Sequence, residues 1–162
     1  MPLGFNVSAR ISRPAPEVFD AVVNPTKLSG YFTTINGASA PLAAGTTVTW
    51  WGEVPVEVDE VTPHERIVLR WDATDAEGRP AYKTRIEMGF KALDDGGTLV
   101  TIAESGWKED KAGLKKSYLN CEGWTQMLCS MKAFLEYGIN LREGYYRSEM
   151  KGEPANEANH AG

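Results

Sequence analysis

The sequence predicts an α+β fold in which a curved antiparallel sheet grips one long C-terminal helix. From Ile35 to about Trp107 the sequence has the pattern of strands and turns, and apolar and polar residues alternate cleanly in two of the predicted strands. From about 115 to 142 the apolar residues recur at helical spacing instead. Two short helix signals follow a first strand near the N-terminus. The expected order is therefore one strand, two short helices, six strands and the long helix.

The first strand and the two short helices are predicted from local signals. The stretch "GFNVSARIS" alternates, and its apolar face is formed by Phe5, Val7, Ala9 and Ile11. The following "RPAPEVFDAVV" changes to helical spacing, with Pro16 suited to a first helical position. In "NPTKLSGYF", Asn24 is the expected N-cap and Pro25 opens the second short helix.

Six further strands are expected between turn signals such as Asp94-Asp95-Gly96-Gly97. Their predicted ranges are 35–40, 46–53, 54–61, 66–73, 81–92 and 98–106. In "RIVLRWD" the residues Ile67, Leu69 and Trp71 share one face, and charged side chains occupy the other. This pattern predicts an antiparallel sheet with one apolar face and one charged face.

Two adjacent tryptophans, Trp50 and Trp51, should leave an extended strand on opposite faces. Val48 shares its parity with Trp50, so we expect Trp50 to face the long helix and Trp51 to lie on the outer face. An exposed Trp51 would mark a partner surface. A β-bulge near Gly52 would exchange the two roles.

The long helix supplies the apolar stripe that covers the sheet. About 28 helical residues span roughly 42 Å, which is enough to cross a whole sheet. The stripe is predicted to contain Cys121, Trp124, Met127, Leu128, Met131, Phe134, Leu135, Gly138 and Ile139. Leu119 and Tyr137 project to the opposite side, where they could form a dimer or partner contact.

Composition restricts the class of protein. The chain has 162 residues, a net charge of −5 and a pI near 5.1, which disfavours nucleic acid as a partner. No apolar run is long enough for a membrane span, and the N-terminus does not resemble a secretory signal, so we expect a cytoplasmic protein. Residues 1–144 are expected to form one domain and 145–162 a polar, disordered tail. Cys121 and Cys129 are too far apart on one helix for a disulfide and are expected to be buried or half-buried thiols.

Four stretches carry a resemblance to a known family. They are "RISRPAPEVFDAVVNPTKLSGYF", "VDEVTPHERIVLRW", "GGTLVTIAESGW" and "EGWTQMLCSMKAFLEYGINLREG". With the order of elements, they resemble the helix-grip superfamily of START-related lipid-transfer domains, pollen-allergen proteins and polyketide cyclases. Within it, the chain is similar to the bacterial branch related to the C-terminal domain of the activator of heat-shock protein 90 ATPase. The resemblance covers about residues 5 to 144.

The resemblance implies a hydrophobic cavity between the sheet and the long helix. Ser117, Asn120 and Cys121 on the inward stripe would be explained by a polar mouth at the N-terminal half of the helix. The alternative is that this end of the helix frays into solvent. The implied function is binding of a small hydrophobic or amphipathic molecule, such as a lipid, without chemical change.

The residues expected to contact the ligand comprise apolar walls and a few polar groups that fix its orientation. They are Trp50, Leu69, Trp71, Tyr82, Ile86, Met88, Glu104, Asn120, Trp124, Met127 and Leu128. Glu104 shares a strand face with Val100 and Ile102, so its carboxylate would lie in or beside the cavity with a raised pKa unless it is hydrogen-bonded. The interpretation that we favour is simpler, a strand-end residue that reaches water or pairs with an arginine.

No catalytic motif, metal-ligand spacing or cofactor fingerprint is recognisable. His64 lies in a turn and His160 in the tail, so both are expected to face solvent, and we predict no metal, no cofactor and no catalytic residue. Two alternatives to binding stay open. One is a cyclase- or hydrolase-like enzyme acting on a polyketide-type or lipid substrate. The other is a module that regulates a chaperone ATPase, with a role in stress response, although the chain has no room for the family's larger N-terminal client-contacting domain.

Overall fold

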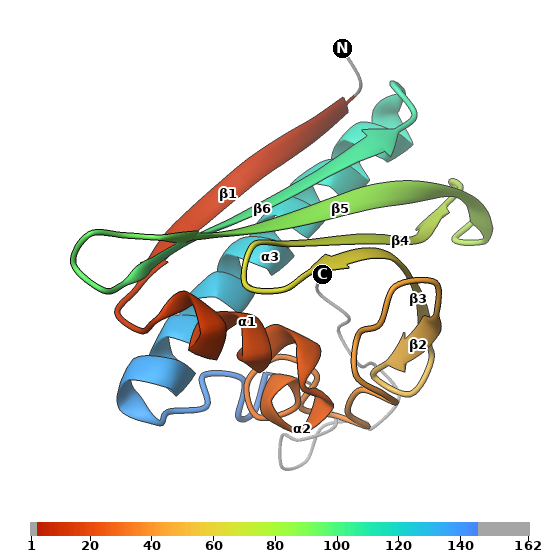
Figure 1. The fold of residues 1–162 in the computed structure, drawn as a ribbon. Helices are drawn as coiled ribbons and strands as arrows, with labels where there is room; N and C mark the ends of the chain where they lie inside the picture. The colour runs from red at the N-terminus through yellow and green to blue at the C-terminus, as the bar shows by residue number, and fades with distance from the viewer. Residues whose placement is uncertain (1–2, 146–162) are drawn as a thin grey trace.

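The computed structural model describes residues 3–145, in which one antiparallel sheet of six strands is combined with three helices (Figure 1). The elements in chain order are β1 (Leu3–Ile11), α1 (Ala15–Val23), α2 (Pro25–Leu28), β2 (Thr47–Trp50), β3 (Val54–Thr62), β4 (Arg66–Thr74), β5 (Pro80–Ala92), β6 (Thr98–Trp107) and α3 (Lys111–Tyr137). The strands lie in the order β1-β6-β5-β4-β3-β2. Residues 146–162 of the predicted tail, and with them His160, lie outside the described residues.

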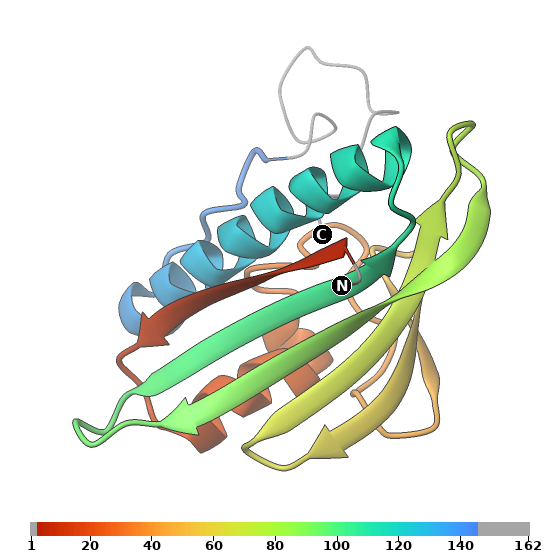
Figure 2. The same cartoon turned by 90° about the horizontal axis from the view of Figure 1, so that it is seen from above.

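The α+β class and the long helix along a curved sheet are confirmed (Figure 2). A bulge in β3, where the register with β4 shifts between Val58 and Glu60, adds to the curvature because bulges bend and twist a strand. The outer face is charged, as expected. Arg70 bonds Asp59 at 2.6 Å, and Lys83 bonds Asp72 at 2.9 Å. No helix of the described residues is both long and apolar enough to cross a membrane.

The second short helix begins as its sequence signals indicate, whereas α1 begins at Ala15, one residue before Pro16. The side chain of Asn24 accepts hydrogen bonds from the backbone N–H groups of Thr26 and Lys27, which satisfies the open end of α2. The segment after α2 brings Tyr31 and Phe32 into the core, where both are fully buried. The Tyr31 ring lies 5.3 Å from the ring of Phe134, so this segment packs near the C-terminal end of α3.

The ends of α3 are defined by their caps. Asp110 accepts a 2.7 Å hydrogen bond from the Gly113 N–H, and Gly138 ends the helix in the left-handed conformation at φ 67°. The helix therefore starts before 115 and stops before 142. Ile139, predicted to face inward, follows the cap and is 51% exposed. Cys121 is half-buried, as expected, whereas Cys129 is exposed.

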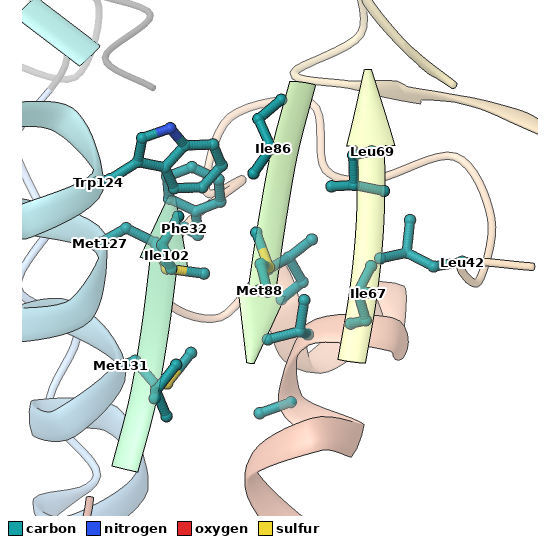
Figure 3. Close-up of a cluster of buried hydrophobic side chains, with 14 of the residues drawn as sticks. Phe32, Leu42, Ile67, Leu69, Ile86, Met88, Ile102, Trp124, Met127 and Met131 are labelled. Atoms are coloured by element: carbon teal, nitrogen blue, oxygen red, sulfur yellow. The ribbon is translucent and has the colours of Figure 1, made fainter. Parts of the chain in front are cut away.

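The core between α3 and the sheet is filled by side chains over the C-terminal half of the helix. Trp124, Met127 and Met131 project from α3 toward Ile102 on β6 and Met88 on β5 (Figure 3). All five are fully buried. Because interiors pack to nearly crystalline density, this part of the sheet and helix forms a dry core.

Two predictions for the segment between α2 and β3 differ from the structure. Residues 35–40 form no strand, and only an isolated bridge links Ala38 to Trp50. Trp51 is only 2% exposed and thus lies inside with Trp50. The strand ends at Trp50, and Trp51 takes a positive φ of 54°, so the alternation of a strand no longer applies to it. The prediction of an exposed Trp51 as a partner surface is therefore wrong.

Candidate functional site

Glu104 lies at the centre of a buried polar cluster between the sheet and α3. The alternation of β6 places Thr98, Val100, Ile102 and Glu104 on its inner face, and Glu104 is fully buried. Asn120 and Trp124 are four residues apart on α3, so they project from one face of the helix toward it. The favoured interpretation of Glu104 as a strand-end residue in contact with water is therefore wrong.

Four side chains donate hydrogen bonds to this carboxylate. The indole Nε1 of Trp71 and Oγ1 of Thr84 donate to Oε2 at 2.8 and 2.7 Å. The indole Nε1 of Trp124 donates to Oε1 at 2.8 Å. The Asn120 Nδ2 lies 3.1 Å from Oε1 and 3.2 Å from Oε2. The cluster thus joins β4, β5, β6 and α3 through one residue.

The donor set matches an ionised carboxylate. Indole N–H and amide NH₂ groups can only donate, so both oxygens of Glu104 must accept from them. Burial raises the pKa of Glu104, and the hydrogen bonds from Thr84, Trp71, Trp124 and Asn120 oppose that rise. Since no arginine or lysine is among these donors, the negative charge is held by neutral dipoles alone.

Aromatic rings surround the cluster and hold its donors in place. The Trp71 and Trp124 rings stack with centroids 5.3 Å apart, and Phe32 stacks on Trp124 at 5.6 Å. Trp50 meets Trp71 edge-on at 6.1 Å. Such ring pairs contribute about 0.5–1.5 kcal/mol each beyond their buried area, so the two indoles that bond Glu104 are rigidly positioned.

A cavity of about 240 Å³ opens beside this cluster. Its lining residues are Trp51, Val54, Trp71, Asp72, Ala73, Thr74, Thr84, Trp107, Lys116 and Asn120. Three of them, Trp71, Thr84 and Asn120, are also donors to Glu104. The cavity therefore lies at the N-terminal half of α3, the end for which Ser117 and Asn120 predicted a polar mouth.

The predicted ligand contacts separate into three groups. Trp71 and Asn120 line the cavity, and Glu104 lies behind it and fixes both. Tyr82 borders a smaller neighbouring pocket, where its Oη accepts a hydrogen bond from the Lys108 N–H. The remaining predicted residues lie in the hydrophobic core and are not in the lining of this cavity; they are Trp50, Leu69, Ile86, Met88, Trp124, Met127 and Leu128.

Several cavity residues have no clear sequence signal. Trp107 ends β6 and does not share the parity of Ile102 and Glu104, so strand alternation does not predict that it faces inward. Lys116 has the ordinary pattern of a solvated helix lysine. Thr84 and Ala73 do follow strand alternation and could have been found: Thr84 shares the inner face of β5 with Ile86 and Met88, and Ala73 shares the inner face of β4 with Leu69 and Trp71.

The curved antiparallel sheet along one long helix, with a cavity at their junction, is a helix-grip architecture. The chain is a member of the family described as Activator of Hsp90 ATPase homolog 1-like protein, whose model matches residues 12–136. A search of curated protein sequences found no match.

Solved structures share the fold. Protein SSP2350 from Staphylococcus saprophyticus has a TM-score of 0.71 at 24% identity, over 86% of this chain and 96% of that chain. The Aha1 dimer from Colwellia psychrerythraea has a TM-score of 0.65 at 18% identity, over 84% and 98% of the two chains. PFC0360w, an HSP90 activator from Plasmodium falciparum, has a TM-score of 0.64 at 17% identity, over 84% and 96%. At these identities the likeness shows the fold alone.

Proposed function

We propose that the protein binds a small hydrophobic or amphipathic molecule in the cavity beside Glu104 without changing it. The observation that carries this proposal is a cavity lined by three indoles, whose walls are fixed by hydrogen bonds to a buried carboxylate. Ligand pockets typically combine apolar, aromatic walls with a few placed polar groups. The lining of Trp51, Trp71 and Trp107 with Thr84 and Asn120 has this character.

The size of the cavity restricts the ligand. At about 240 Å³ it lies below the common range for drug-sized ligands, which begins near ~300 Å³. It is larger than the roughly 150 Å³ that accommodates benzene in an engineered protein cavity. A molecule of one or two rings is therefore a better fit than a long acyl chain.

The contacts of Glu104 support binding rather than acid–base catalysis. Both of its oxygens are occupied by donors, and it is fully buried behind the cavity wall. A general acid or base must come within hydrogen-bond reach of the group that it protonates or deprotonates. In this arrangement Glu104 acts through Asn120 and Thr84 as a positioning residue.

Titration with a panel of one- and two-ring compounds and lipids tests the proposal. Binding should change the tryptophan fluorescence, because three indoles line the cavity, and should raise the melting temperature. Ala73→Leu should fill the cavity and abolish both responses while the circular dichroism spectrum is retained. Ala92→Leu, at an exposed end of β5, is the matched control. Failure of every compound to bind the wild-type protein would refute the proposal.

Family membership favours a second candidate function, regulation of a chaperone ATPase. A bacterial Hsp90 homologue should then co-elute with the protein, and its ATPase rate should change on addition. Unchanged elution and an unchanged rate would exclude this candidate without affecting the first.

A further inference from the structure

One cation lines the cavity without an ionic partner. Lys116 is half-buried on α3, four residues before Asn120, and both belong to the cavity wall. Within residues 3–145 it forms no ion pair and no hydrogen bond through its side chain. Most of the other lysines and arginines near the sheet are paired; Lys83, for example, bonds Asp72 at 2.9 Å. A half-buried cation that faces a cavity is well placed to bind an anion from it.

The negative groups near the cavity are already compensated. Asp72 is the acidic residue of the lining, and its carboxylate is bonded by Lys83. Glu104 is separated from the cavity by Trp71, Thr84 and Asn120, whose donors it holds. The uncompensated charge that the wall offers to a ligand is therefore the ammonium group of Lys116.

The amide of Asn120 adds a second polar contact. Its Nδ2 is committed to the two oxygens of Glu104, which only accept when ionised. Its Oδ1 accepts no hydrogen bond from residues 3–145. Because Lys116 and Asn120 lie one helical turn apart on the same face, the cavity combines a cation and a neutral acceptor about 6 Å apart along the helix.

Building on the proposed binding function, we infer that the cavity selects a flat aromatic molecule with an acidic group, whose anion pairs with Lys116. The three indoles contact the ring system, and Lys116 binds the carboxylate or an equivalent anion. A hydroxyl on the ring would donate to Oδ1 of Asn120. Neutral aromatics of the same shape bind the same walls more weakly.

A matched pair of probes tests this inference. 2-Naphthoate carries a carboxylate, and 2-naphthalenemethanol is a neutral molecule of similar size. Both are titrated by tryptophan fluorescence at pH 7.5 against the wild-type protein, Lys116→Met, Lys116→Arg and Lys115→Met. Lys115 is exposed on the same helix and is not in the cavity lining, so it controls for the general charge of α3.

We expect the wild-type protein to bind 2-naphthoate about tenfold more tightly than the alcohol, the usual effect of a hydrogen bond to a charged group. Lys116→Met should reduce the affinity for 2-naphthoate to that for the alcohol, Lys116→Arg should keep most of the preference, and Lys115→Met should leave the preference unchanged. Added salt should weaken the binding of 2-naphthoate but not that of the alcohol, because salt screens the attraction between charges.

The outcomes separate this inference from the binding function on which it rests. Equal affinities for the two probes, or a preference that survives in Lys116→Met, would overturn the inference of an acidic ligand paired with Lys116. The proposed binding function would remain intact. If neither probe binds the wild-type protein and the wider panel also fails, both are refuted.

Discussion

At the scale of single residues, Glu104 shows how a costly group can be placed inside a small domain. A buried carboxylate without a cation is tolerated only when hydrogen bonds satisfy both oxygens. Here the donors come from β4, β5 and α3, at positions 16 to 33 residues from Glu104 in the sequence. The same bonds fix the rings and the amide of the cavity wall. Glu104 therefore connects the stability of the fold to the shape of the site.

This residue should produce a measurable dependence of stability on pH. Burial raises the pKa of Glu104 above the ordinary value of 4.5, so the folded state binds this proton more tightly than the unfolded chain. The free energy of unfolding should therefore decrease as the pH rises from about 4.5 through the folded-state pKa. Urea unfolding of the wild-type protein and of Glu104→Gln between pH 5 and pH 8 measures this decrease.

Glu104→Gln should remove this decrease, because glutamine does not titrate. The substitution should also lower the free energy of unfolding by about 1–3 kcal/mol at pH 5. The glutamine NH₂ group replaces an oxygen that accepted hydrogen bonds, so a buried N–H group is left without an acceptor. Arg70 and Lys132 lower the pKa values of Asp59 and Glu136. These two carboxylates therefore stabilise the fold throughout pH 5 to 8, and their stabilisation is lost only at lower pH. An equal slope in both proteins would show that Glu104 does not titrate differently in the folded state.

Trp51 shows how one backbone angle can reverse the direction of a side chain. Its φ of 54° ends the strand and turns the indole inward, where Nε1 donates to the Phe32 carbonyl oxygen at 3.2 Å. Its ring centroid lies 4.9 Å from that of Phe32. The ring thus becomes part of the cavity wall rather than an outer surface.

At the scale of elements, α3 has two halves with different roles. The C-terminal half packs Met127, Leu128 and Met131 into the core, whereas the N-terminal half presents Lys116 and Asn120 to the cavity. The outward side carries Leu119 and Tyr137, which are 48% and 69% exposed, as the helical spacing predicts. One helix therefore provides both the dry core and one wall of the site.

The C-cap of α3 allows a direct test. Gly138 has a φ of 67°, and a Cβ added there would meet no atom within 4 Å, so strain is the only penalty. Gly138→Ala should lower the free energy of unfolding by about 1–2 kcal/mol, because most side chains disfavour the left-handed region. Gly138→Asn should cost less, since asparagine tolerates this region better. Thermal melts of both variants measure these costs. Equal melting temperatures for the alanine and asparagine variants would contradict a left-handed conformation at Gly138.

At the scale of the whole molecule, sheet and helices share one continuous core. The buried cluster includes Phe19 from α1, Phe32 after α2, Ile86 from β5 and Trp124 from α3. No part of the described residues has a separate core of that size, so the elements should lose their structure together.

We therefore expect one unfolding transition in urea. The near-ultraviolet signal of the tryptophans reports the packing around the cavity, and the far-ultraviolet signal reports α3 and the sheet. Their midpoints should coincide, as in a two-state domain. Loss of the tryptophan signal at a distinctly lower urea concentration would show that the cavity end unfolds independently.

Local patterns in the sequence were sufficient to predict the fold class and most of the elements. Alternation and helical spacing depend on local burial, so they located β4, β5, β6, α1, α2 and the core half of α3. The same periodicity placed Asn120 and Glu104 on inward faces. The prediction of a strand at 35–40 is wrong because a short stretch of small apolar and polar residues (INGASA) has the same local pattern whether or not a partner strand pairs with it.

The surroundings of Glu104, Trp51 and Lys116 follow from contacts that form only when the chain folds. Their roles depend on neighbours that are distant in the sequence: the two indoles that bond Glu104, the Phe32 carbonyl that receives Trp51, and the cavity beside Lys116. Periodicity states which face a residue occupies but not which atoms meet it there. For that reason the cavity and its proposed charge preference became visible only when β4, β5, β6 and α3 were brought together.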